Sequence, residues 1–284
     1  MSTKPFAQVT LGSWVEIHNY SKTGWIYRGQ RRVDWPLRTS LERCFDRHSI
    51  PQSRAREVEG DLLREFRRAY HHYSQHVPSP TDIIEWLSLM QHHGAPTRLL
   101  DFTYSIYVAS YFALETADQD AAVWAVDGRW ALNESARLLE AAGKDHNDVQ
   151  RLRDRFVEGS ESITQNLFFE SPLVPLACPM NPFRLNERLR IQKGVFLIAG
   201  SVEAPFAQNL ATFPQHDSPD KILKIVIPRS IAEDALVELF QMNISRASLF
   251  PGLDGYAQAL GVLHPSFKKG GMFWYESKDP LTSS

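Results

Sequence analysis

Residues 89–114 mix polar side chains into a segment that otherwise has the composition of a buried core. The sequence of this segment is LMQHHGAPTRLLDFTYSIYVASYFAL, and the tetrapeptide YRGQ at residues 27–30 shows the same mixture. Polar groups that can bind phosphate, ribose or amide groups are kept inside apolar surroundings where a binding site is built. A chain with two such segments has to fold so that they are partly buried, and we expect them to contribute to one site.

Local patterns predict both strands and helices. The expected strands are residues 25–27 leading into Arg28, 97–102, 121–126, 195–198 and 222–227. The expected helices are residues 53–76, a helix opened by Ser79 and ended by Gly94, one capped by Thr103 or Ser105, residues 130–142, 145–158 and 161–170, and one opened by a capping box of Ser230 and Glu233. Prolines at 172, 175, 179 and 182 indicate a connector.

These signals do not alternate regularly, which favours an α+β fold over a doubly wound parallel sheet. The phosphate-loop patterns GxGxxG and GxxxxGK[ST] are absent. With 284 residues, 43% hydrophobic and 23% charged, the chain is predicted to form one compact domain over residues 1–284, with a helical insertion at approximately 129–170.

The charge balance limits the classes of partner. A net charge of −2 creates no global field towards nucleic acid or anionic membrane. The first ten residues lack the apolar core of a signal peptide, and no uncharged run is long enough to cross a bilayer. We therefore expect a cytoplasmic protein without a membrane partner, whose Cys44 and Cys178 are reduced thiols.

One segment departs from this balance. Residues 28–68 contain eleven arginines and no lysine, against seven acidic residues. Most of these arginines are expected to pair with the neighbouring acids on a solvated helix face. The alternative is a local surface for phosphate groups.

Arg28 and Gly29 form the first candidate pair. The glycine would let a ligand approach the backbone while the guanidinium binds an anion. The alternative is an arginine paired with Asp34 or Asp101. The neighbouring Gln30 could hydrogen-bond an amide or a ribose.

Gln91, His92, Arg98 and Asp101 form the second candidate group. His92 could act as a general base or bind ribose, or it could simply satisfy the last carbonyls of its helix. Arg98 and Asp101 could reach the site, although a buried ion pair between them is the favoured interpretation. No HExxH, CxxC or HxH spacing is present, so no metal is expected, and the absence of GxSxG gives no support to a serine triad.

These segments resemble the FRG domain family. The resemblance rests on the aromatic-Arg-Gly-Gln opening, on Trp35-Pro36-Leu37 and above all on QHHGAPTRLLDFT at residues 91–103. It extends to RLRIQKGVF at 188–196 and to LFPGLDG at 249–255. The family is largely bacterial and is associated with toxin and phage-defence roles, so the resemblance implies such a role.

A more distant resemblance is to NAD-dependent ADP-ribosyltransferases. It implies a split sheet of mixed and antiparallel strands with a helical layer, and NAD as a substrate without a permanently bound cofactor. The residues it implies for catalysis are Arg28, His92, Asp101, Glu187 and Gln192. The residues it implies for dinucleotide binding are Tyr27, Arg28, Gly29, Gln30, Gln91, His92, Arg98, Thr103 and Tyr107.

The chemistry of such an enzyme needs a cationic clamp for the pyrophosphate and one carboxylate near the ribose, where positive charge develops. The sequence departs from that pattern, because Gln192 stands at the prominent polar position and cannot supply the charge. Either Glu187 or Asp101 supplies it, or the protein binds a nucleotide without transferring anything. A metal-independent nuclease with His92 as acid or base, or a module that senses nucleic acid, are the alternatives. The acceptor would be a protein or a nucleic acid, and the resemblance implies an antitoxin or a defence-system protein as partner.

Overall fold

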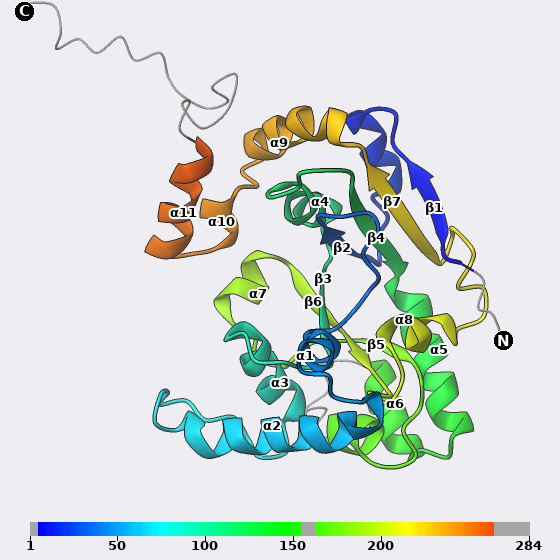
Figure 1. The fold of residues 1–284 in the computed structure, drawn as a ribbon. Coiled ribbons are helices and arrows are strands. Elements are labelled where there is room, and N and C mark those ends of the chain that lie inside the picture. Colours follow the sequence, from blue (N-terminus) through cyan, green and yellow to red (C-terminus); the bar gives the residue numbers. More distant parts are fainter. Residues whose placement is uncertain (1–4, 155–162, 264–284) are drawn as a thin grey trace, which may run out of the picture.

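One mixed sheet organises the molecule. The computed structural model describes residues 5–154 and 163–263, and in these residues seven strands form a sheet of order β1-β7-β4-β2-β3-β6-β5 (Figure 1). The strands are β1 (Ala7–Thr10), β2 (Trp25–Gln30), β3 (Leu99–Thr103), β4 (Ala121–Asp127), β5 (Ala177–Met180), β6 (Gly194–Ala199) and β7 (Ile222–Ile227). The edge pair β1–β7 is parallel and the other pairs of this sheet are antiparallel. The expected mixed α+β architecture is confirmed, while its relation to an ADP-ribosyltransferase core stays a prediction.

Helices lie on both faces of this sheet (Figure 1). The α-helices are α1 (Ser40–His48), α2 (Ala55–Tyr70), α3 (Ile83–His92), α4 (Ile106–Leu114), α5 (Gly128–Ala141), α6 (His146–Asp154), α7 (Glu187–Ile191), α8 (Phe206–Ala211), α9 (Ala232–Gln241), α10 (Arg246–Leu249) and α11 (Leu253–Leu263). Shorter turns are the 3₁₀ helices η1 (Trp14–Tyr20), η2 (Gln52–Arg54) and η5 (Arg229–Ile231) and the π-helix η4 (Gln165–Phe169).

The central strand β4 shows how the core is divided. Its side chains alternate: Trp124 and Val126 belong to the core cluster that includes residues of α2, α3, α5 and α6, whereas Val123 and Ala125 belong to the cluster that includes residues of η1, α4 and α9. Six consecutive residues of β4 are buried because both faces of the strand are covered.

The sheet opens between β2 and β3. β2 pairs with β4 over six residues, and β3 pairs with β6 over five. In the described part of the chain, β2 and β3 themselves share the single registered pair Tyr27–Thr103. The two strands therefore diverge beyond this pair, and the divergence creates space next to Arg28 and Asp101.

Several helix starts differ from those predicted. Ser53 does not cap α2, because it lies inside the turn η2, and the helix ends at Tyr70 rather than near residue 76. Asp82, not Ser79, caps α3 by accepting the backbone N–H of Glu85 at 3.0 Å. The capping box of Ser230 and Glu233 is wrong, because the turn η5 precedes α9 and no side chain caps that helix.

Other differences concern the connector and the insertion. The proline-rich connector contains the edge strand β5, which accommodates Pro179 because edge strands tolerate a missing donor. The segment expected as a helix over residues 161–170 contains the π-helix η4. The parts of the two predicted helices that fall on residues 155–162 lie outside the described residues. None of the described helices combines the length and apolarity needed to cross a membrane.

Candidate functional site

A cleft opens where β2 and β3 diverge. The inner hollow, of about 210 Å³, lies between β2, β3, α4 and α7. The middle hollow, of about 60 Å³, lies between α3 and α7, and the outer hollow, of about 380 Å³, lies between α7 and α10–α11. Asp101, Arg188 and Gln192 line both the inner and the middle hollow, while His92, Asn186 and Arg188 line both the middle and the outer one. These shared walls make the three hollows one cleft.

Arg28 lies on β2 at the point of divergence. Its Nη1 donates to the backbone oxygen of Asp101 at 2.7 Å and lies 3.8 Å from Oδ2 of the same residue. The side chain is 19% exposed, and its buried Nε has no hydrogen-bond partner among the described residues. Burial lowers the pKa of Arg28, and Arg43 adds to this shift while Asp101 opposes it. A desolvated guanidinium that lines a cleft is suited to an anionic ligand.

Asp101 is held beside this arginine by Gln91. Gln91 Nε2 donates to Asp101 Oδ2 at 2.9 Å, and its Oε1 accepts from Thr97 Oγ1 at 2.6 Å and Ser40 Oγ at 3.2 Å. The Asp101 side chain remains 55% exposed. The segment 91–103 thus positions an exposed carboxylate where the inner and middle hollows meet, 3.8 Å from Arg28 Nη1.

Thr103 and Gln192 connect β3 to α7. Thr103 Oγ1 donates to the backbone oxygen of Gln192 at 2.7 Å, and Gln192 Nε2 donates to the Leu249 oxygen of α10 at 3.1 Å. Both residues line the inner hollow. Their hydrogen bonds fix the walls of the cleft relative to β3.

His92 and Glu187 lie towards the outside. His92 is in the last turn of α3, is exposed, and lines the middle and outer hollows. Partial burial lowers its pKa, and the charges of His93 and Arg188 lower it further. Glu187 stands in the first turn of α7 and lines the outer hollow.

Three of the candidate residues do not line this cleft. Gln30 is buried, accepting from Trp124 Nε1 at 2.8 Å and donating to the Pro36 oxygen at 3.2 Å. Tyr107 bonds His18 Nδ1 through its hydroxyl at 2.8 Å, on the side of η1.

Arg98 is the third. It is 1% exposed and forms its ion pair with Glu59 of α2, not with Asp101. Arg98 and Asp101 are three positions apart in an extended segment, so their side chains leave it on opposite sides. The predicted mutual pair is therefore wrong, although an ion pair does lock the core.

Tyr27 and Gly29 border the inner hollow and also serve the fold. The Tyr27 hydroxyl donates to the Tyr20 oxygen at 2.9 Å and accepts from the Lys22 N–H at 2.8 Å. A Cβ on Gly29 would overlap the carbonyl oxygen of Ala109. The glycine is therefore required for the close approach of α4 to β2.

The arginine-rich segment is largely neutralised. Arg32, Arg38, Arg54, Arg64 and Arg68 form ion pairs with Asp34, Asp46, Glu57, Asp61 and Glu65 respectively. Asp34 is thereby engaged with Arg32 and not with Arg28. The interpretation of paired arginines on a solvated face accounts for these five residues.

Sequence reasoning did not select Arg188 as a site residue. This arginine of α7 lines all three hollows. A signal was present, because the segment 188–196 contributed to the family resemblance and Arg188 is its first residue. The LFPGLDG segment gave a similar signal, since Phe250 and Asp254 line the outer hollow.

The described residues contain no group of three or more His, Cys, Asp or Glu side chains arranged to hold a metal ion. Cys44 and Cys178 are free thiols, of which Cys178 is buried.

The model of the FRG domain family matches residues 23–122. The match confirms the resemblance to the FRG family for the part of the chain that runs from β2 into β4, including Arg28 and the segment 91–103. Comparison with curated proteins and with solved structures finds no match. The residues of α7, α10 and α11 that complete the cleft lie outside the matched range.

Proposed function

We propose that the protein is an NAD-dependent ADP-ribosyltransferase and that the cleft between β2, β3 and α7 binds NAD. The observation that carries the proposal is the position of a desolvated guanidinium, Arg28, beside an open carboxylate, Asp101, where the sheet splits. A toxin or defence setting, with a macromolecular acceptor and a neutralising partner, belongs to the same proposal and is supported by the FRG match alone.

Transfer of ADP-ribose from NAD requires one positive and one negative group at the site. When the bond between nicotinamide and ribose breaks, its electron pair goes to the ring nitrogen and positive charge develops on the sugar. A fixed carboxylate stabilises that charge, and a guanidinium binds the pyrophosphate. The acceptor's nucleophilic atom then bonds to the ribose carbon and loses its proton to a base. Burial lowers the pKa of His92, which favours the unprotonated imidazole that such a base requires.

The geometry favours Asp101 over Glu187 as the carboxylate. Asp101 lines the inner and middle hollows and lies next to Arg28, while Glu187 lines the outer hollow. Gln91 fixes the orientation of the Asp101 carboxylate, which is the preorganisation that electrostatic catalysis needs.

The test is to incubate the purified full chain with NAD, alone and with cell fractions, and to follow nicotinamide release and transfer of labelled ADP-ribose. We expect NAD to be consumed and the Arg28→Ala variant to lose this activity. Arg31→Ala is the matched control, because Arg31 is exposed, stacks on Trp35 and lies outside the cleft. Circular dichroism shows whether each variant is folded. Unchanged NAD with every fraction contradicts the proposal.

A further inference from the structure

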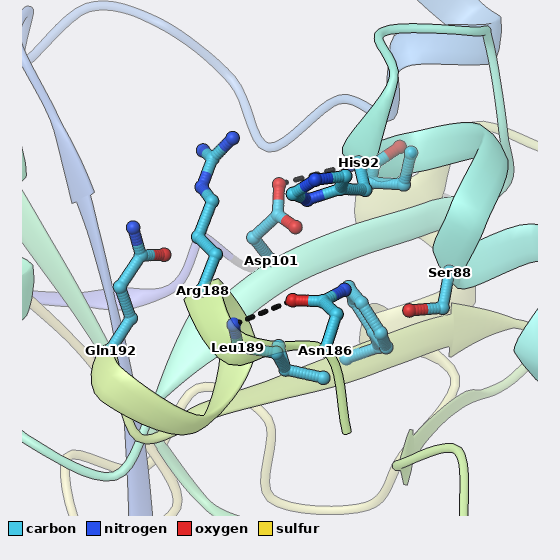
Figure 2. A pocket seen from close by; sticks show the side chains of 9 residues that line it. Ser88, His92, Asp101, Asn186, Arg188, Leu189 and Gln192 are labelled. Atoms are coloured by element: carbon cyan, nitrogen blue, oxygen red, sulfur yellow. Dashed lines mark hydrogen bonds between the residues drawn. The ribbon is translucent and has the colours of Figure 1, made fainter. Parts of the chain in front are cut away.

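Arg188 presents a guanidinium that has no hydrogen-bond acceptor among the described residues. Figure 2 shows its side chain extending from α7 between Gln192 and Asp101. Across residues 5–154 and 163–263, no side chain or backbone group forms a hydrogen bond or an ion pair with it; its contact is the ring of Phe250, 4.8 Å from the guanidinium carbon. Its N–H groups are therefore available to a ligand.

The other arginines at the cleft are engaged. Arg246 donates to Glu115 Oε1 at 2.7 Å and to Gln258 Oε1 at 2.8 Å, which joins α10 to α4 and α11. Arg28 is tied to the backbone of Asp101. Arg188 differs from both because, within the part of the chain that the structure describes, its N–H groups donate to no acceptor.

The position of this guanidinium is nevertheless restrained. The ring of Phe250 on which it stacks makes an edge contact with Phe112 of α4, with ring centroids 5.9 Å apart. Asn186 caps α7 by accepting the Leu189 N–H at 2.8 Å. A guanidinium stacked on an aromatic face is preorganised and presents its N–H edges to phosphate.

We propose that Arg188 is the second phosphate-binding residue of the cleft. Arg28 on β2 and Arg188 on α7 line the same inner hollow, and together they hold the two phosphates of a pyrophosphate-bearing nucleotide. The inference rests on the proposed function where it takes this nucleotide to be NAD. Two guanidinium groups that line one hollow favour a ligand with two phosphates over an uncharged nucleoside.

The experiment measures binding of ADP, NAD and adenosine to the full chain by calorimetry, for the wild type, Arg188→Gln and Arg188→Lys. We expect Arg188→Gln to weaken ADP and NAD binding about tenfold to a hundredfold, because it removes charge-assisted hydrogen bonds, and to leave adenosine binding unchanged. Arg188→Lys keeps the charge and should recover part of the loss. Arg190→Gln is the matched control, since Arg190 lies on the same helix, is exposed and lines none of the three hollows.

The outcomes separate the two proposals. If Arg188→Gln binds ADP and NAD as the wild type does, the role of Arg188 is overturned even when NAD is consumed. If Arg188→Gln selectively loses ADP and NAD binding while the wild type leaves NAD unchanged, the role of Arg188 stands and the transferase is refuted. A wild type that binds neither ADP nor NAD overturns the role of Arg188 as well. Melting temperatures of all variants exclude loss of folding as the cause.

Discussion

The segment 91–103 contributes to two arginine–carboxylate arrangements that differ in burial, in distance and in hydrogen bonding. In the first, Arg98 donates to both oxygens of Glu59 and to the Phe168 oxygen at 2.7 Å, and both side chains are 1% exposed. In the second, Arg28 and Asp101 are 3.8 Å apart, 19% and 55% exposed, and the Arg28 Nε has no partner among the described residues.

The difference separates structural charges from charges available to a ligand. The Arg98–Glu59 pair offsets its desolvation with a nearly complete set of hydrogen bonds, and nothing is left for a substrate. The Arg28–Asp101 pair is incompletely satisfied and opens into a cleft. Charged residues three positions apart in one motif therefore have different roles, and hydrogen-bond satisfaction tells them apart.

The largest expected effect is on stability, at the buried Arg98–Glu59 ion pair. Glu59→Gln leaves the Arg98 charge buried without its counterion, so the free energy of unfolding should fall by about 3–5 kcal/mol. Urea denaturation measures this change. Glu65→Gln, in the same helix α2, is the control; the exposed Glu65–Arg68 pair predicts a loss of at most about 1 kcal/mol. Equal losses in the two variants would remove the distinction between the two arrangements.

The next effect is on catalysis at the open pair. Asp101→Asn should lower kcat/KM for nicotinamide release by about 10²–10³, because it removes the carboxylate that stabilises the charge on ribose. Stability should change by at most about 1 kcal/mol, since Arg28 keeps its bond to the backbone oxygen. Glu187→Gln is the matched control and should retain most activity. The reverse result, with Glu187→Gln inactive and Asp101→Asn active, would assign the catalytic carboxylate to the outer hollow.

A smaller effect on stability is expected at Gly29, the residue that follows Arg28. Gly29→Ala would force α4 away from β2, so we expect a loss of about 1–3 kcal/mol in the free energy of unfolding, measured by urea denaturation. Gly60→Ala, in the exposed middle of α2 where a Cβ meets nothing within 4 Å, should instead raise stability by about 0.5–1 kcal/mol. A stable Gly29→Ala with weakened ligand binding would restore the idea that the glycine admits a ligand.

Much of the fold followed from local patterns. The run ILKIVI at residues 222–227, apolar except for Lys224, became β7 with the predicted bounds. Gly94, with φ +82, follows the C-terminal end of α3, as its position indicated. Ser105 was one of two expected caps and accepts the Val108 N–H at 3.3 Å. The strands β1 and β5 were missed because each has four residues and lies at an edge, where pairing rather than composition makes a strand.

The site was less accessible to sequence reasoning because its geometry depends on long-range pairing. The single Tyr27–Thr103 pair that splits the sheet has no local signature. The partner of Arg98 lies 39 positions away in α2, so a motif alone could not distinguish that arginine from a ligand-binding one. Arg188 has no ion-pair partner among the described residues because the fold places no carboxylate within bonding distance of it, and this too has no local sequence signal.

The smallest expected effect concerns the protonation of His92. Burial, His93 and Arg188 lower its pKa below the ordinary value of 6.5, so the acid limb of the activity profile should lie below that pH. A lowered pKa in the folded state means that the unfolded chain binds the proton more tightly. The contribution of His92 to stability is therefore present above pH 6.5 and is lost as the pH falls through the lower, folded value.

Removing one cause tests this account. Arg188→Gln eliminates one positive charge near the imidazole, so the pKa of His92 should rise towards 6.5 without reaching it, because burial and His93 remain. Titration of the His92 ring protons by NMR, assigned with His92→Gln, measures the shift, and the acid limb of nicotinamide release should move in the same direction. A limb that stays in place while the NMR pKa moves would show that His92 is near the charge of Arg188 but is not the base, which would confine the reactive part of the cleft to Arg28 and Asp101.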